Sequence, residues 1–87
     1  MKDPLSEAFP AEFPIKVMGR AGSDLAVTAR AIVENHMGPL AETAIRTRTS
    51  SDGNFVSLTY TVLAASRTQL DALYRELSAC KLVLMAL

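Results

Sequence analysis

The chain has 87 residues, of which 49% are hydrophobic and 21% are charged, a composition typical of one folded domain and atypical of a disordered chain. Its basic and acidic residues balance to a formal net charge of zero, which disfavours non-specific nucleic-acid binding, because such binding needs an excess of Lys and Arg. Cys80 is the only cysteine, so one chain can form neither an internal disulfide nor a thiolate zinc site.

The start of the chain predicts neither export nor membrane insertion. It lacks the basic start and apolar run of a signal peptide, and no apolar run approaches the ~20 residues of a membrane-spanning helix. We therefore expect a soluble, cytoplasmic protein that makes no membrane contact. Residues 1–11, with Pro4 and Pro10, are expected to form a flexible arm. Residues 12–87 are expected to form a single α+β domain.

The first expected strand covers residues 13–18. Phe13, Ile15 and Val17 alternate with Lys16 and Met18, and this period of two is typical of a strand with one buried face. A glycine-containing loop follows at residues 19–22.

A helix is expected after this loop, with Ser23 as its N-cap and Asp24 in its first turn. It should run to about residue 36, where Gly38-Pro39 ends it. Its apolar stripe comprises Leu25, Ala29, Ile32, Val33 and His36.

The second expected strand covers residues 41–49. Thr43, Ile45, Thr47 and Thr49 fall on one side, and Glu42, Arg46 and Arg48 fall on the other. Because this is the most polar strand, we expect it at an edge of the sheet.

A hairpin turn at residues 51–53 leads into the third expected strand. Asp52-Gly53 is a strong turn dipeptide, because glycine accepts a positive φ without steric cost. From residue 56 onward apolar and hydroxyl residues alternate, which predicts a central strand with one buried face. The apolar set is Val56, Leu58, Tyr60 and Val62, and the hydroxyl set is Ser57, Thr59 and Thr61.

The second helix has the clearest pattern in the chain. Ser66 and Gln69 match a capping box, in which the serine caps the helix and the glutamine reaches back. Its buried face is expected to comprise Leu70, Leu73, Tyr74 and Leu77. A fourth strand is expected from Lys81 to Leu87.

The resulting order β-α-β-β-α-β predicts a ferredoxin-like fold, with a four-stranded antiparallel sheet and both helices on one face. Right-handed crossovers put strands one and three in the centre of that sheet and strands two and four at its edges.

Several segments, in this order, resemble a known family. They are Phe13-Pro14-Ile15-Lys16-Val17-Met18-Gly19, the segment from Ser50 to Leu58, the segment from Ser66 to Leu77, and Val83-Leu84-Met85-Ala86-Leu87. Together they are similar to the YbeD-like family of small uncharacterised bacterial proteins. The resemblance implies an ACT-like version of the ferredoxin fold, which is shared with regulatory domains that bind amino acids. It implies no enzymatic activity.

The loop before the first helix is the first candidate site. Free N–H groups at the helix start, together with Lys16, Arg20 and the Ser23 hydroxyl, can hold a small carboxylate. Gly19 and Gly22 would let such a ligand approach the backbone. In ACT-like domains the corresponding loop often lines an effector site. The alternative interpretation is a plain strand-to-helix connection.

The uncovered sheet face is the second candidate. It should carry Lys16, Met18, Arg46, Arg48, Ser57, Thr59 and Thr61. RNA-binding sheets of this architecture present aromatic rings for base stacking, whereas Ser57 and Thr59 occupy the expected positions here and Tyr60 points to the core. A solvated face or a protein-docking face is therefore favoured over a nucleic-acid platform.

No catalytic group, metal site or cofactor is predicted. His36 is expected at a helix C-terminus, where it interacts with the dipole, and Cys80 is expected to pack rather than react. The leading functional hypothesis is a non-enzymatic regulatory or protein-interaction module with an unknown protein partner and a small-molecule effector such as an amino acid. Single-stranded nucleic-acid binding through the open face is the alternative, and an enzyme is the third hypothesis. We expect a monomer or a weak homodimer.

Overall fold

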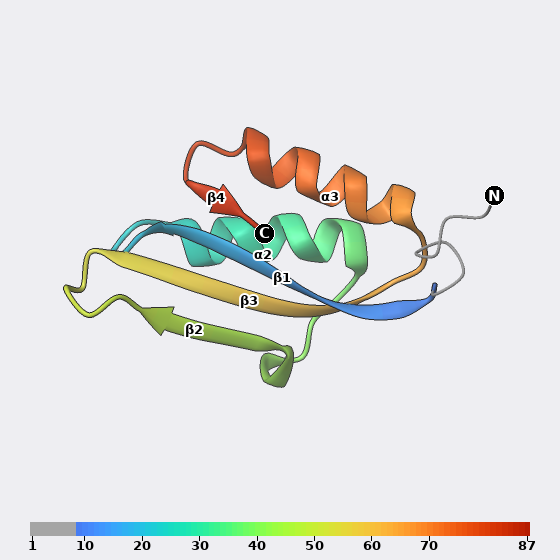
Figure 1. Cartoon of the computed structure of the whole chain (residues 1–87), viewed down its shortest axis with the longest axis horizontal. Helices are drawn as coiled ribbons and strands as arrows, with labels where there is room; N and C mark the ends of the chain where they lie inside the picture. The colour runs from blue at the N-terminus through green and yellow to red at the C-terminus, as the bar shows by residue number, and fades with distance from the viewer. Residues whose placement is uncertain (1–8) are drawn as a thin grey trace.

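The computed structural model describes residues 9–87. The expected arm at residues 1–11 lies mostly outside this range, and its last residue, Ala11, begins the first strand. The elements are β1 (Ala11–Arg20), α2 (Leu25–Met37), the short 3₁₀-helix η1 (Glu42–Ala44), β2 (Ile45–Thr49), β3 (Phe55–Ala64), α3 (Arg67–Ala79) and β4 (Met85–Ala86) (Figure 1).

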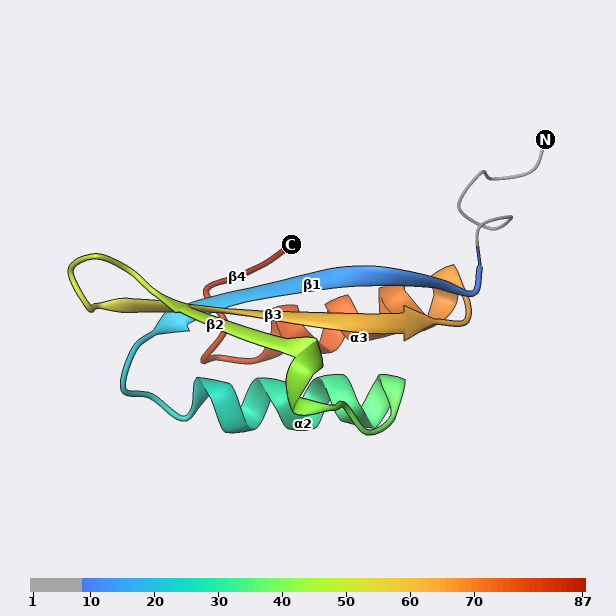
Figure 2. The same cartoon turned by 90° about the horizontal axis from the view of Figure 1, so that it is seen from below.

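The strands form one four-stranded antiparallel sheet in the order β2-β3-β1-β4. Both helices lie on the same side of this sheet, and its other face is left uncovered by any helix (Figure 2). The expected ferredoxin-like arrangement is confirmed, with the first and third strands in the centre and the second and fourth at the edges.

The pairing of β1 with β3 forms the centre of the sheet. Each strand has 10 residues, and the register runs from Ala11 opposite Ala64 to Arg20 opposite Phe55. Successive side chains of a strand point to opposite faces. Ile15 and Val17 therefore face the helices, where both are fully buried, and their even-numbered neighbours face the other way.

The core lies between the sheet and the two helices. As expected from the sequence, the buried set includes Leu58, Tyr60, Val62, Leu70, Leu73 and Leu77. Val56 is only half-buried, because it lies next to Gly19, which has no side chain, on one side and next to the exposed Thr49 on the other.

The Ser66 cap of α3 and the backward reach of Gln69 are confirmed, although Gln69 bonds the N–H of Ala65 rather than that of Ser66, and Gln69 also joins the two helices. The Ser66 hydroxyl accepts a hydrogen bond from the Gln69 N–H, and Gln69 Oε1 accepts one from the Ala65 N–H at 2.7 Å. Gln69 Nε2 donates to the His36 carbonyl oxygen at 2.9 Å. The side chain that caps α3 therefore also satisfies a carbonyl at the end of α2.

The start of α2 differs from the prediction by one residue. Asp24, rather than Ser23, is the N-cap, and the helix begins at Leu25. The Ser23 hydroxyl accepts a hydrogen bond from the Leu25 N–H at 3.2 Å and donates one to the Arg20 carbonyl oxygen at 2.7 Å. Ser23 thus closes the preceding turn, a local bond that competes with capping.

The predicted strand at residues 41–49 was too long, because only Ile45–Thr49 is extended. Residues 42–44 form η1, which the hydrogen bond from the Ala44 N–H to the Ala41 carbonyl closes. Arg30 holds this segment, since its guanidinium lies 2.7 Å from the Glu42 carboxylate and donates to the Leu40 carbonyl oxygen. The same carboxylate raises the pKa of Arg30.

The predicted strand at residues 81–87 was also too long. Only Met85–Ala86 is extended, although the Leu84 N–H donates to the Met18 carbonyl oxygen and Leu87 exchanges two hydrogen bonds with Lys16. Before that, the Val83 N–H bonds the Cys80 carbonyl oxygen and makes a turn. Leu82 and Val83 pack against the core there instead of joining the sheet. The first strand, in contrast, is longer than the predicted 13–18.

We predict that Leu58→Ala and Leu73→Ala each lower the free energy of unfolding by about 2–5 kcal/mol, because each removes a packed core side chain. Leu63→Ala is the matched control, since the Leu63 side chain is 64% exposed and should change stability by less than about 0.5 kcal/mol. Urea denaturation measures all three. Equal losses for Leu58 and Leu63 would contradict the assigned strand faces.

The hairpin between β2 and β3 yields a second prediction. Gly53 has a φ of 78°, as expected from the sequence, so Gly53→Val should destabilise by at least about 1–2 kcal/mol, because the left-handed region is unfavourable for β-branched residues. Gly53→Asn should cost much less, since asparagine tolerates this conformation. Thermal unfolding compares the two variants, and equal melting temperatures would contradict the turn geometry.

Candidate functional site

The uncovered side of the sheet is the main candidate surface, and we call it the open face. Two rows of side chains cross it from β2 to β4. In the first row, Arg48 pairs with Ser57, Ser57 with Met18, and Met18 with Met85. This row therefore begins with an arginine on the edge strand β2.

The second row also begins with an arginine and a hydroxyl, but it has a lysine on β1 where the first row has a methionine. Arg46 pairs with Thr59, and Thr59 with Lys16. Lys16 in turn exchanges two backbone hydrogen bonds with Leu87, at 3.0 and 2.8 Å. The open face thus has arginines on β2, hydroxyls on β3, Met18 with the cations Lys16 and Arg20 on β1, and apolar side chains at β4.

The open face is rich in positive charge although the whole chain is neutral. Lys16, Arg20, Arg46 and Arg48 project from it and are exposed. Among the paired strand residues only Glu12, near the far end of β1, adds an acidic side chain. Within residues 9–87 none of the four cations forms an ion pair. Within that range, no acidic side chain therefore neutralises their charges.

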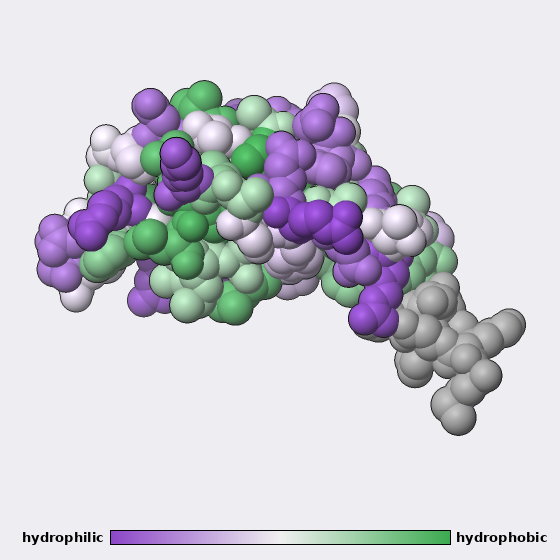
Figure 3. All heavy atoms as spheres, turned by 90° about the horizontal axis from the view of Figure 1, so that it is seen from above, coloured by the Kyte–Doolittle hydropathy of each residue, from purple (hydrophilic) through white to green (hydrophobic). Residues whose placement is uncertain are grey.

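Exposed apolar side chains accompany these cations. Phe55 is 38% exposed, Met85 50% and Leu87 61%. The Arg20 guanidinium carbon lies 5.7 Å from the centre of the Phe55 ring, within the range of a cation–π contact. Seen from the α3 and β4 side, hydrophobic residues gather between hydrophilic residues to the left and to the right of them (Figure 3).

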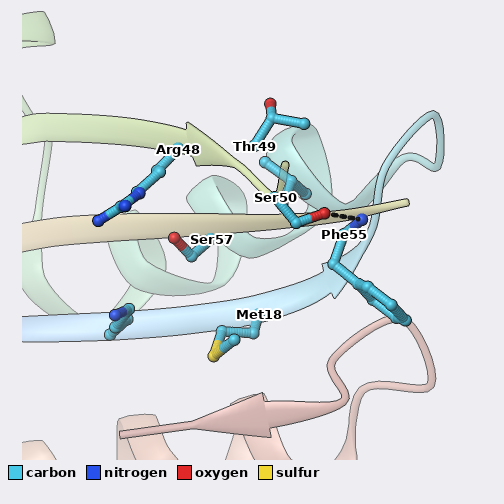
Figure 4. A pocket seen from close by; sticks show the side chains of 8 residues that line it. Met18, Arg48, Thr49, Ser50, Phe55 and Ser57 are labelled. Carbon is cyan, nitrogen blue, oxygen red and sulfur yellow. Dashed lines mark hydrogen bonds between the residues drawn. The ribbon is translucent and has the colours of Figure 1, made fainter. Parts of the chain in front are cut away.

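A shallow hollow of about 210 Å³ lies on the open face near the hairpin. Figure 4 shows Ser57 between Arg48 and Met18, with Phe55 to the right of these three side chains. Ser50 holds the hairpin here, because its hydroxyl accepts from the Phe55 N–H and donates to Asp52 at 2.6 Å. That hydrogen bond, followed by one from the Asn54 N–H, lowers the pKa of Asp52.

The structure separates the residues of the other predicted site, the loop at 19–23. Arg20 and Ser23 line a hollow of about 130 Å³ together with Lys81, Leu82 and Leu84. Lys16 instead lines the hollow on the open face. Gly19 and Gly22 line neither of them.

Gly19 has a packing role that the sequence did not reveal. It is buried, and a Cβ added to it would lie 2.5 Å from the Leu82 carbonyl oxygen and 2.6 Å from Leu25 Cδ2. The side of Gly19 that would receive a ligand is therefore occupied by the chain itself. Gly22 has a φ of 78° and nothing within 4 Å of its Cβ position, so its need for glycine is conformational.

The comparisons with known proteins agree with the resemblance in the sequence. A family model described as "Protein of unknown function (DUF493)" matches residues 6–87. The chain belongs to this family. It is similar to a UPF0250 protein of Janthinobacterium, with 48% identity over 86% of this chain and 82% of the relative. It is also similar to a UPF0250 protein of Paraburkholderia phytofirmans, with 40% identity over 91% of this chain and 89% of the relative.

The two remaining candidate residues, His36 and Cys80, make contacts with neighbouring parts of the fold. His36 lies in the last turn of α2, as expected, and its Nε2 is 2.7 Å from a Glu76 carboxylate oxygen on α3. Cys80 is half-buried at the end of α3, and its N–H bonds the Leu77 carbonyl oxygen. No group of metal-ligating side chains occurs among residues 9–87, and no helix in that range is long and apolar enough to span a membrane.

A third hollow, of about 250 Å³, lies between α2 and β2. Leu58 and Tyr60 line this hollow, together with the exposed Val27 and the ion pair of Arg30 and Glu42. Burial raises the pKa of Tyr60 to about 12. Arg30 is already held by Glu42 and by the Leu40 carbonyl, so this hollow offers no uncommitted cation.

Sequence reasoning missed part of the open face. It placed Lys16, Met18, Arg46 and Arg48 there correctly, but it left out Arg20, Phe55, Met85 and Leu87. Strand alternation alone already indicates Arg20 and Phe55, because each lies two residues from a residue of the open face, Met18 and Ser57 respectively. The last two depend on the register of β4 against β1, which no sequence pattern sets.

We predict that Gly19→Ala lowers the free energy of unfolding by about 1–3 kcal/mol, the usual range for overpacking, because the Leu82 carbonyl is backbone and cannot move aside alone. Gly22→Ala is the control and should cost only about 1 kcal/mol, from its φ. Chemical denaturation measures both. If Gly19→Ala left the free energy of unfolding unchanged, the packing role of Gly19 would be wrong, and the loop could again be proposed as a ligand site.

Proposed function

We propose that this protein is a non-enzymatic interaction module that binds a partner protein through the open face. The observation that carries the proposal is the composition of that face, which combines four cations that form no ion pair within residues 9–87 with exposed Phe55, Met85 and Leu87. Exposed apolar side chains beside charged groups are typical of protein-docking surfaces. Uncompensated like charges also favour an oppositely charged partner and accelerate its association.

Two features favour a protein over single-stranded nucleic acid. Phe55 is the only aromatic side chain among the paired open-face positions, and Arg20 already lies over its ring. The other apolar groups are aliphatic or thioether side chains, which suit the side chains of a protein but do not form the stacking platforms that bases require.

A small-carboxylate effector near the loop at 19–23 is the second candidate. It is supported by Arg20 and Lys81, which line one hollow of about 130 Å³. The support is weaker there than on the open face, because the Ser23 hydroxyl already makes two hydrogen bonds within the loop and Gly19 is packed.

Affinity capture with the full chain tests the proposed docking face. The charge-reversal double variant Arg46→Glu with Arg48→Glu should lose a protein partner that the wild type retains. The identified partner, purified, should then bind the variant at least about tenfold more weakly by calorimetry, a difference of about 1.4 kcal/mol.

Arg75→Glu on the exposed surface of α3 is the matched control and should retain the partner. A partner that binds the wild type and the open-face variant with equal affinity would contradict the proposal. Loss of binding in the Arg75 variant alone would move the docking surface to the helices.

A further inference from the structure

We propose that the segment bound by the open face is an amphipathic α-helix of the partner, with an acidic stripe over β2 and an apolar stripe over Met18 and β4. This inference rests on the proposed function and deepens it by naming the chemistry and the shape of the bound segment. It depends on the order of chemistry in the two rows that cross the sheet.

The width of the open face fits one helix. Neighbouring strands lie about 4.8 Å apart, so the three steps from β2 to β4 span about 14 Å. An α-helix with its side chains is about 10–12 Å wide. Ser57 and Thr59, which are small, occupy β3 between the arginines and the larger side chains of β1, and they leave room for a rounded element to settle.

The spacing along the strands fits the helical repeat. Arg46 and Arg48 are two residues apart on β2, which separates them by about 6.7 Å. Two residues at i and i+4 of a helix lie about 6 Å apart along its axis. Acidic side chains at such positions can therefore meet both arginines together, and each Arg–carboxylate contact can be bidentate.

The apolar side chains of β4 have the same two-residue spacing as the arginines of β2. Met85 and Leu87 are two residues apart beside β1, and Met18 lies next to Met85. The helix would place apolar residues at i+1 and i+5 over these side chains, about 100° around its axis from the acidic pair. Thioether and leucine side chains adapt to such partners, as they do in other helix-binding grooves.

A strand added to a sheet edge does not explain these observations. Strand addition uses the free backbone groups of an edge, whereas the cations and the apolar side chains project from the face of the sheet, and the β2 arginines lie two strands from Met18 and three from Met85. The β4 edge is also short, with only Met85–Ala86 extended.

The test uses a defined synthetic peptide of about 15 residues, roughly four helical turns. It carries Glu at i and i+4 and Leu at i+1 and i+5. One control peptide has the same composition with the Glu residues moved to the side opposite the Leu residues. A second control has a central Pro, which breaks the helix.

Titration of the ¹⁵N-labelled full chain should shift amides of β1, β3 and the Arg46–Arg48 segment. The parent peptide should bind at least about tenfold more tightly than either control peptide, and circular dichroism should show that it gains helix on binding. Arg46→Glu with Arg48→Glu should weaken its binding by at least about tenfold, whereas Arg75→Glu should not.

Several results would overturn the inference. If the Pro-containing peptide binds as tightly as the parent and its shifts map to the open face, the bound segment is extended, and the proposed function stands without the helix. The inference also fails if the parent peptide causes no open-face shifts at about 1 mM. Shifts confined to the helices, or tighter binding of a single-stranded oligonucleotide at the same salt concentration, would overturn both proposals.

Discussion

The antiparallel pairing of β1 with β3 is the interaction on which the rest of this structure depends. It joins 10 residues of each strand, separated in the chain by α2, η1 and β2. A slip of one residue would exchange the faces of every side chain in the slipped strand, which would expose Ile15 and Val17 and bury Lys16. The burial of Ile15, Val17, Leu58 and Tyr60 against the helices opposes such a slip and thereby also fixes what faces outward.

The same register produces the segregation of charge. The chain as a whole is neutral, so its composition predicts no charged surface. The cations of β1 and β2 nevertheless share one face because their positions have the same parity in register, whereas Arg30 on α2 is paired with Glu34 and Glu42 on the other side of the sheet. The cationic open face is thus made from residues whose charges are balanced by acidic residues elsewhere in the chain.

Most of the fold could be predicted, because the strand and helix patterns, the Gly53 turn and the Ser66 cap are local signals. The errors arose where tertiary contacts override local preference. Arg30 bonds Glu42 and the Leu40 carbonyl oxygen, and η1 forms there in place of the first part of the expected strand. Leu82 packs against the core, so the fourth strand begins only at Met85. For the candidate site, strand alternation correctly predicted that Lys16, Arg46 and Arg48 share the open face. The positions of Met85 and Leu87 at its apolar edge depend on the register of β4 against β1, which the sequence does not indicate. Gly19 was predicted to let a ligand approach the backbone, but the Leu82 carbonyl oxygen and the Leu25 side chain occupy the space next to it, and these neighbours come from the turn before β4 and from α2.

The register of the sheet is therefore the central claim, and side-chain nuclear Overhauser effects test it most directly. In selectively methyl-labelled protein, the Met18 methyl group should show contacts to the Met85 methyl group and to Ser57, and none to Leu73 or Leu77. Contacts from Ile15 and Val17 should reach the leucines of the core instead. Strong contacts between Met18 and the α3 leucines would show that β1 is shifted by one residue, and the open face described above would not exist.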